Sequence, residues 1–530
     1  MVSARVSSVL NGNIDSIRQR KGKVNKPVQR AIGFLKDRTN LLSALGGPQS
    51  LAGWDEEVYM PKGAVNGRAW AMGIAAQHGH DLFTDNKVGT NLKKVEESGQ
   101  LENLSLAEQR FIELLRRGYD KSTKLPSSFV REQSEVLTKA QQAWKEAKGK
   151  NDFSIFAPHL KKVVELARKA VAYLNPTSSN PYDVLLDNYE LGMTSAKLES
   201  IFGPLRDQTV QLLRAIQEKG VQRPSGIIGI NYPKQKQFKV AHDLLRVIGY
   251  DFNRGRLDLS AHPFTIEIGG PHDVRVTTRI LQDNPFSNIG SAMHEGGHGI
   301  HGQQISGELV QESLSGSPSL GISESQSRFF ENLVGKNRAF WEFYYPKLQK
   351  AFPTQLKDVS LDDFYLAMNY VEPSLIRVEA DELTYNLHII VRWELEKALM
   401  EGNLSVDDAP TAWEEKMEEY VGVRPNNVRD GILQDVHWSQ GYFGYFPTYS
   451  IGNLIAPQLQ HAAQKELGDL DELLRNGDIT PIREWLGKHV HWYGDMLTPD
   501  EVVKGVTGES LNPDYSANYM RAKFSSIYNL

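Results

Sequence analysis

Two histidines and a glutamate near the middle of the chain have the spacing of a metal site that hydrolyses peptide bonds. His294 and His298 stand four residues apart, and Glu295 directly follows the first histidine. On a helix, residues four apart share one face, so both imidazoles can bind one zinc ion while Glu295 lies about 100° away. An open position on such an ion holds water with a lowered pKa, and the glutamate can accept its proton. The pattern predicts a metallopeptidase site.

The alternative is a glycine-rich helix that carries two ordinary histidines. With 14 histidines in 530 residues, a chance His-Glu-x-x-His is expected roughly 0.02 times in such a chain, which favours the metal site. His301 could also approach a metal, but an extra histidine of this kind is more often a surface residue, and we expect that here. Gly296 and Gly297 each weaken a helix by roughly 1 kcal/mol relative to alanine. We therefore expect backbone or substrate to approach closely there.

The third metal ligand must come from elsewhere, and it must be a histidine or a carboxylate because the sequence has no cysteine. Glu324 is the strongest candidate. It lies 26 residues beyond His298, in a segment whose apolar pattern predicts a helix packed against the first. That spacing suits two antiparallel helices. Glu331 is the rival, and we interpret it as an exposed carboxylate or as one that supports a ligand from outside.

The elements that must position these residues are mainly helical. The helix of the two histidines is expected to begin at Pro285 or Ser287. Just before it, apolar and polar residues alternate over 264–268 and again over 274–280, and residues 269–271 are Gly-Gly-Pro. This pattern predicts a β-hairpin beside the metal helix. The hairpin either holds an extended peptide by main-chain hydrogen bonds or only caps the helical core.

Composition excludes several classes of protein. Apolar residues make up 40% and charged residues 24%, as in ordinary globular proteins, and the net charge of -5 lacks the basic excess of a nucleic-acid binder. The lack of cysteine fits a reducing compartment, and no apolar run approaches the roughly 20 residues that cross a bilayer. We expect a soluble cytoplasmic protein that binds neither nucleic acid nor membrane.

The first 30 residues differ from the rest in charge. They carry seven arginines or lysines and one acid, Asp15. An organellar transit sequence is one interpretation, but a solvated basic tail is the favoured one. The predicted organisation is a basic extension over residues 1–30, followed by a single domain over residues 31–530.

Six short motifs occur in one order along the chain. They are His262-Pro263-Phe264, Asp273-Val274-Arg275-Val276-Thr277, His294-Glu295-Gly296-Gly297-His298, Glu324-Ser325-Gln326, Ile376-Arg377-Val378-Glu379-Ala380-Asp381 and Gly431-Ile432-Leu433-Gln434-Asp435-Val436-His437-Trp438. In this order they resemble the motifs of the carboxypeptidase Taq family of metallocarboxypeptidases. The resemblance runs from about Leu41 to near the C-terminus, and only the first 30 or so residues lie clearly outside it.

The resemblance implies a mainly α-helical enzyme with two lobes around a deep active-site groove and a small hairpin or sheet beside the zinc helix. It also implies a homodimer that releases single amino acids from peptide C-termini by metal-activated water attack, with zinc or cobalt as the metal. By this similarity His294, His298 and Glu324 bind the metal and Glu295 is catalytic. The sequence departs from the family pattern at Ser323, where the family often has histidine.

A carboxypeptidase must also bind the free carboxylate of its peptide substrate. Arginine does this best because its planar fork donates two hydrogen bonds to a carboxylate. Arg377 is the preferred candidate within the matching motifs, and Arg275 is the second. The alternative for Arg377 is an exposed ion pair with Asp381, four residues further along the same helix.

Three other side chains could act on bound substrate. His437 could donate to the oxyanion or to a ligand, and Tyr445 could donate to the oxyanion, although tyrosines in such aromatic stretches usually belong to the core. His262 could stabilise substrate or simply close the hairpin. Two rival functions stay open: a zinc oligopeptidase or endopeptidase without a carboxylate receptor, and a catalytically inactive helical scaffold that binds peptides.

Overall fold

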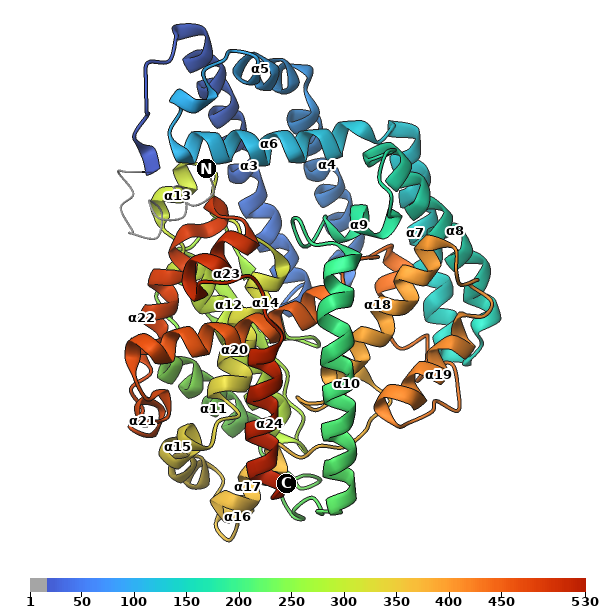
Figure 1. The fold of residues 1–530 in the computed structure, drawn as a ribbon, viewed down its shortest axis with the longest axis vertical. Helices are drawn as coiled ribbons and strands as arrows, with labels where there is room; N and C mark the ends of the chain where they lie inside the picture. Colours follow the sequence, from blue (N-terminus) through green and yellow to red (C-terminus); the bar gives the residue numbers. More distant parts are fainter. Residues whose placement is uncertain (1–16) are drawn as a thin grey trace.

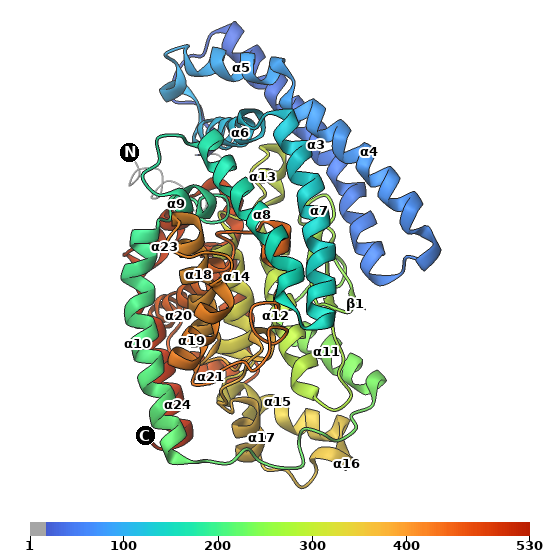
Figure 2. The ribbon, with the colours of Figure 1, turned by 90° about the vertical axis from the view of Figure 1, so that its right-hand side faces the viewer.

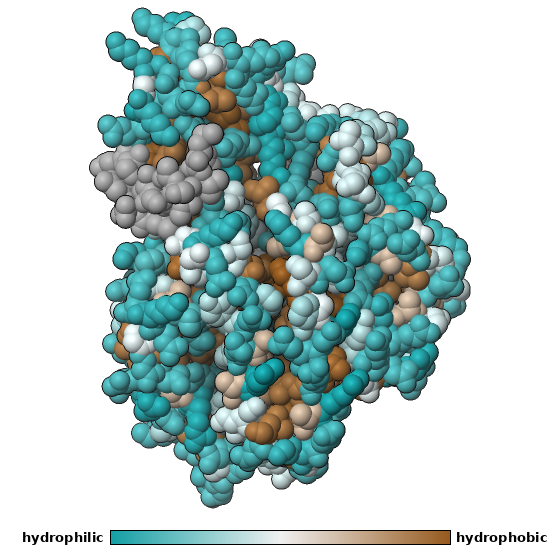
Figure 3. All heavy atoms as spheres, in the orientation of Figure 1, coloured by the Kyte–Doolittle hydropathy of each residue, from teal (hydrophilic) through white to brown (hydrophobic). Residues whose placement is uncertain are grey.

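The computed structural model describes residues 17–530 and is built almost entirely of α-helices, with one three-stranded sheet (Figure 1). The mainly α fold with a small sheet beside the metal helix is therefore confirmed. On the face drawn in Figure 1, hydrophilic side chains cover most of the surface, and hydrophobic ones appear mainly in recesses between helices (Figure 3). No helix among residues 17–530 is long and apolar enough to cross a membrane.

The described chain is helical up to the sheet, and the first helices form the upper layer of Figure 1. These elements are α3 (Lys26–Val58), η1 (Lys62–Ala64), α4 (Val65–Thr84), α5 (Asn86–Glu96), η2 (Leu101–Asn103), α6 (Leu106–Lys124), α7 (Ser127–Lys150), α8 (Phe153–Leu174), α9 (Pro181–Leu186), α10 (Ser195–Lys219) and α11 (Lys234–Ile248).

The sheet follows, and the remaining elements are again helical. They are β1 (Leu257–Leu259), β2 (Thr265–Glu267), β3 (Val274–Thr278), α12 (Pro285–Gln304), α13 (Gly307–Gln311), α14 (Leu320–Arg328), the π-helix η3 (Phe329–Val334), α15 (Arg338–Ala351), α16 (Pro353–Leu356), α17 (Leu361–Met368), η4 (Arg377–Glu379), α18 (Tyr385–Glu401), α19 (Ala409–Val421), η5 (His437–Gln440), α20 (Pro447–Leu467), α21 (Leu470–Arg475), α22 (Thr480–His489), η6 (His491–Met496), α23 (Pro499–Thr507) and α24 (Asp514–Tyr528).

The basic segment before α3 packs against the rest of the chain where the structure describes it. Ile17 is fully buried, and Arg20 donates three hydrogen bonds to the carboxylate of Glu108 at 2.6 to 3.1 Å. Arg18 pairs with Glu308 at 2.8 Å. The expectation of a solvated tail is wrong for Arg18 and Arg20, which meet carboxylates of the body. Lys21, Lys23, Lys26 and Arg30 are exposed. Residues 1–16 of the predicted extension lie outside the described residues.

The predicted hairpin is confirmed and belongs to a slightly larger sheet. Strands β2 and β3 pair antiparallel, with Thr265 opposite Val276, and β1 adds a parallel strand on the other side of β3. Both Gly269 and Gly270 in the turn have positive φ, of 75° and 112°, which glycine adopts at no steric cost. The order β1-β3-β2 leaves β2 at an edge, next to α12.

Helix α12 lies at the centre, packed against α11, the sheet and α14 (Figure 1). Its contact with α14 is made by backbone. A Cβ atom on Gly297 would lie 2.5 Å from the carbonyl oxygen of Gln326 and 2.7 Å from the Cα of Ser327. The two helices can approach this closely only because residue 297 has no side chain. The close approach expected from the two glycines is therefore confirmed at Gly297.

Gly297→Ala should destabilise the protein by roughly 1–3 kcal/mol, because the backbone of α14 must move away from the new methyl group. Gly290→Ala on the same helix is the matched control, since its Cβ would meet nothing within 4 Å. That substitution should stabilise the protein by up to about 1 kcal/mol. Urea unfolding midpoints of the two variants measure the difference, and equal midpoints would contradict the close helix contact.

Candidate metal centre and active site

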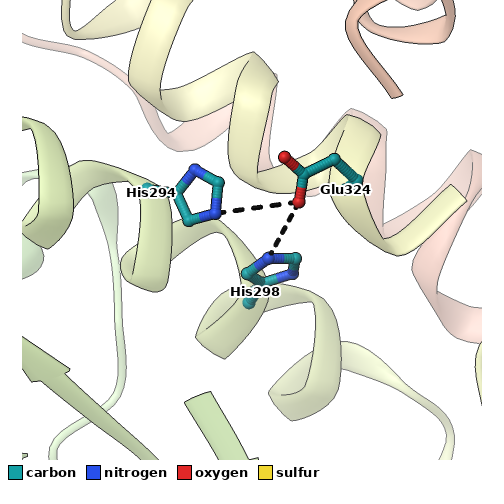
Figure 4. A group of neighbouring side chains, drawn as sticks. All are labelled: His294, His298 and Glu324. Carbon is teal, nitrogen blue, oxygen red and sulfur yellow. Dashed lines mark ion pairs between the residues drawn. The ribbon is translucent and has the colours of Figure 1, made fainter. Parts of the chain in front are cut away.

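The three predicted metal ligands face one point, two from α12 and one from α14 (Figure 4). The Nε2 atoms of His294 and His298 lie 3.7 and 3.5 Å from Oε2 of Glu324, and all three atoms lie within 4.8 Å of one another. Neighbouring ligand atoms around a tetrahedral zinc ion are about 3.4 Å apart, given bonds of about 2.0–2.2 Å. Two imidazoles and one carboxylate in this arrangement fit a divalent zinc-like ion.

Local sequence explains where the two helices begin. Pro285 occupies the first turn of α12, and the side chain of Asn284 accepts a hydrogen bond from the backbone N–H of Phe286. Pro285, rather than Ser287, therefore starts the helix. Helix α14 starts after Ser319, whose hydroxyl accepts from the N–H of Ile322. A side chain thus caps the N-terminus of each of the two helices, which fixes where each helix begins.

Each metal-facing histidine has a partner on its other ring nitrogen. Nδ1 of His294 lies 2.8 Å from Oε2 of Glu331, and Nδ1 of His298 lies 3.1 Å from Oγ of Ser323. With the proton on Nδ1, each ring donates outward and presents the lone pair of Nε2 to the shared point. Glu331 is thus not exposed but contacts a candidate ligand. Ser323, where the sequence departs from the family pattern, supports the other.

Charges around Glu324 keep its carboxylate ionised. Burial raises the pKa of this group, but the cationic Arg328 and the two histidines outweigh burial and lower the pKa to about 2. For His294, burial lowers the pKa, whereas the carboxylates of Glu324 and Glu331 raise it above the ordinary value of 6.5. A carboxylate that stays ionised at neutral pH is what a metal ligand requires.

Glu295 is 6% exposed and faces the cavity beside the metal ligands. Its Oε2 accepts a hydrogen bond of 2.7 Å from the hydroxyl of Thr265, on the edge strand β2. This contact fixes one of the two carboxylate oxygens of Glu295. Sequence reasoning missed Thr265, and the alternation that predicted the strand was the only available signal, because it placed that residue beside the helix.

The cavity next to the centre has a volume of about 670 Å³. His262, Arg279, His294, Glu295 and Arg377 are among the residues that line it. It is therefore large enough for the end of a peptide, and it brings polar groups of both signs next to the metal ligands.

Arg377 lies at this cavity, but its environment differs from the expected one. It sits in the short η4 rather than on a long helix, and it is 6% exposed. Its Nε and Nη2 donate to Oδ1 of Asp435 at 3.1 and 2.9 Å, and its Nη1 donates to the hydroxyl of Tyr385 at 3.0 Å. The alternative considered for Arg377, an exposed pair with Asp381, is therefore wrong. The Asp381 carboxylate instead accepts from the backbone N–H groups of Leu383 and Thr384, where the chain turns into α18.

The second arginine candidate lies away from the cavity. Arg275 donates to both oxygens of Asp273, at 2.9 and 2.8 Å, and its guanidinium stacks on Trp54 of α3 at 4.4 Å. These contacts hold it against α3, so the structure does not bring Arg275 together with the metal ligands.

His437 and Tyr445 belong to one aromatic cluster, and neither is among the residues that line the cavity. The His437 ring lies 4.4 Å from the ring of Phe446 and 5.5 Å from that of Tyr445, and its Nδ1 is 4.0 Å from Asp435. Burial lowers the pKa of His437 to about 4, so the ring is neutral at pH 7. For Tyr445, burial and the nearby Glu324 raise the phenol pKa. Both side chains therefore remain candidate donors.

His262 lies in the loop between β1 and β2 and is exposed at the cavity. Its backbone carbonyl accepts a hydrogen bond of 2.5 Å from the hydroxyl of Ser260. The backbone of this residue therefore helps close the loop, and its imidazole is exposed at the cavity.

A buried histidine contacts both α12 and α14, the helices that carry the candidate ligands. His491, at the start of η6, is fully buried, with Nδ1 2.6 Å from Oε1 of Gln304 on α12 and Nε2 2.7 Å from Oε1 of Gln326 on α14. The ring of His301 lies 4.9 Å from that of His491 and is 3% exposed. The expectation that His301 is a surface residue is wrong, because residues far along the chain cover it.

Glu190, which follows α9, binds the start of α14. It is 2% exposed, and its carboxylate accepts from the backbone N–H of Gly321. Burial raises its pKa from 4.5 to about 8. The folded state thus keeps a proton that the unfolded state loses above pH 4.5, and the carboxyl's contribution to stability falls as pH rises towards 8.

Glu190→Gln should therefore gain stability relative to the parent protein between pH 4.5 and 8, by at most about 1.4 kcal/mol per pH unit, and then level off. Urea unfolding at a series of pH values measures this. A stability difference that is independent of pH would show that Glu190 is ionised in the folded protein.

Comparison with known proteins gives one consistent result. The model of the carboxypeptidase Taq (M32) metallopeptidase family matches residues 35–524. Carboxypeptidase 1 of Bacillus subtilis is 39% identical over 91% of this chain and 95% of its own, and thermostable carboxypeptidase 1 of Thermus thermophilus is 39% identical over 94% and 98%. A solved M32 carboxypeptidase from Deinococcus radiodurans R1 has a TM-score of 0.91 and 35% identity, covering 94% of this chain and all of that one.

Proposed function

The chain belongs to the carboxypeptidase Taq (M32) family of metallopeptidases, and we propose that the divalent ion on which its carboxypeptidase activity depends is zinc, held by His294, His298 and Glu324. The observation that carries this proposal is the convergence of two imidazole Nε2 atoms and one carboxylate oxygen on a single point at the cavity. Cobalt suits the same ligand set.

An ion held there would polarise the scissile carbonyl and lower the pKa of an attacking water molecule. Glu295 accepts the proton of that water and passes it to the amine that leaves. The hydroxyl of Thr265 holds Oε2 of this glutamate, so Oε1 carries the proton. His437 and Tyr445 are the side-chain donors proposed for the negative charge that develops on the carbonyl oxygen.

The peptide itself is proposed to lie against the edge strand β2. One edge of β2 pairs with β3, its other edge pairs with no strand among residues 17–530, and its Thr265 side chain contacts Glu295. An extended peptide added there would gain main-chain hydrogen bonds. His262, at the head of this strand, then meets the residues before the scissile bond.

We propose that Arg377 binds the free carboxylate of the substrate. It lines the cavity, and Asp435 and Tyr385 hold its guanidinium in one orientation. Arg279 is a second cavity arginine, one that sequence reasoning missed. Its buried Nε has no hydrogen-bond partner among residues 17–530, so it has a donor to spare.

The test follows release of the C-terminal amino acid from an N-blocked dipeptide, with the same peptide amidated at its C-terminus beside it, each with and without chelator. Release from the free acid alone, lost with chelator, supports the proposal. Equal cleavage of the amide would favour an oligopeptidase.

Arg377→Lys should lower kcat/KM for the free acid about 10- to 100-fold, since a charge-assisted pair contributes about 1.5–3 kcal/mol. The same loss in Arg279→Lys alone would move the role to Arg279.

We further propose that the enzyme is a cytoplasmic homodimer whose residues 31–530 act as one two-lobed domain. The lack of cysteine supports the compartment. In support of the dimer, α4 reaches away from the body beside α3 (Figure 2) and exposes Trp70 by 72% and Ile74 by 50%. Light scattering of the purified protein measures the assembly.

A further inference from the structure

Arg328 touches both carboxylates of the metal centre. It stands one helical turn after Glu324 on α14, and its side chain is 12% exposed. Its Nε donates to Oε1 of Glu324 at 2.7 Å, and its Nη1 donates to Oε2 of Glu331 at 3.0 Å. Glu331 in turn contacts Nδ1 of His294. One guanidinium thus connects a proposed ligand to the residue that supports another ligand.

The two oxygens of Glu324 are therefore unequal. Oε2 faces the Nε2 atoms of both histidines, at 3.7 and 3.5 Å, whereas Oε1 is bound to Arg328. A carboxylate can coordinate a metal through one oxygen or through two. Coordination through Oε1 as well would place the cation close to the Arg328 guanidinium and make this oxygen share its lone pairs between the two, which weakens a charge-assisted hydrogen bond in a buried site.

From this geometry we infer that Arg328 is a positioning residue that restricts Glu324 to coordination through Oε2 alone. The inference rests on the metal centre proposed above. Its consequence is that three protein atoms bind the ion and a fourth position stays open to water and substrate, as catalytic zinc sites require.

Arg328 is itself held in place. Its guanidinium lies over the ring of Tyr385, 4.6 Å from the centroid, and the hydroxyl of that tyrosine accepts from Arg377. Lys336 is the other cation close to Glu331, at 3.4 Å from Oε1. A lysine at position 328 would keep the charge but could not donate to two carboxylates through a rigid fork.

The test uses Arg328→Lys, with Arg116→Lys as the matched control, because Arg116 also donates to two carboxylates, those of Glu96 and Asp120, and does not line the cavity. Three quantities are measured: zinc affinity by competition with a chromophoric chelator, the visible spectrum of the cobalt(II)-loaded protein, and thermal unfolding of the metal-free protein. Arg328→Lys should weaken zinc binding about 10- to 100-fold and reduce the cobalt absorption as coordination number rises. Arg116→Lys should change neither the zinc affinity nor the cobalt spectrum, and thermal unfolding shows whether each variant folds.

Wild-type zinc affinity and cobalt spectrum in Arg328→Lys would overturn the inference. If that variant does not fold, X-ray absorption at the zinc edge of the wild-type protein decides the matter. A single Glu324 oxygen at about 2.0–2.2 Å supports one-oxygen coordination, and two oxygens at bonding distance refute it. A wild-type protein that binds no zinc at all would overturn the proposed centre itself, and the inference with it.

Discussion

Replacement of Glu295 by glutamine should lower kcat by about 10²- to 10⁴-fold and leave KM and zinc content nearly unchanged. Glutamine has the size of glutamate and can still accept the hydrogen bond from Thr265. It cannot take a proton from water at neutral pH. The loss therefore falls on the chemical step, because the metal ligands and the cavity stay as they are.

The measurement is kcat and KM for the free-acid dipeptide, together with metal content by atomic absorption. Glu342→Gln is the control, since Glu342 is a surface glutamate paired with Arg475 at 2.7 Å. A Glu295→Gln enzyme that keeps more than about a tenth of wild-type kcat would assign the proton transfer to another group.

Glu324→Ala should remove most of the zinc affinity, with a loss larger than the 10- to 100-fold typical of residues that only support ligands. Alanine leaves two imidazoles, and Arg328 then keeps only Glu331 as a carboxylate partner. Excess positive charge next to the two histidines opposes the binding of a cation. Activity should vanish after dialysis and return only in part at high zinc concentration.

Glu331→Gln is the natural comparison for that variant. It retains all three ligands and a side chain of similar shape beside His294, so its zinc affinity should fall less than that of Glu324→Ala. Zinc content after dialysis, measured on both variants, gives the order. Full retention of zinc by Glu324→Ala would exclude Glu324 as a ligand.

Much of the fold and part of the centre could be predicted from local patterns. Spacing of four placed His294 and His298 on one helix face, and the alternating residues after position 263 predicted the hairpin, since both signals depend on periods within one element. The packing of α12 against the helix that carries Glu324 was predicted from the 26-residue separation of His298 and Glu324. Gly297 signalled a close contact because a glycine inside a helix is costly.

Contacts between distant elements could not be predicted in this way. Arg377 pairs with Asp435, 58 positions further on, and not with the acid four residues away, because the chain turns before α18. Thr265 reaches Glu295 from another element, and the alternation that predicted its strand does not identify Glu295 as its partner. The burial of His301 depends on His491. Such contacts arise from tertiary packing, which overrides local preference.

The bridge formed by His491 has a consequence for biosynthesis. All three proposed ligands are made well before this histidine, which joins the helices that carry them through Gln304 and Gln326. At 5–20 residues per second, roughly ten to forty seconds separate the synthesis of His298 from that of His491. A nascent chain thus holds every ligand but lacks the residue that locks the two helices together. Metal insertion into the finished geometry belongs to the last stage of translation or to the released chain.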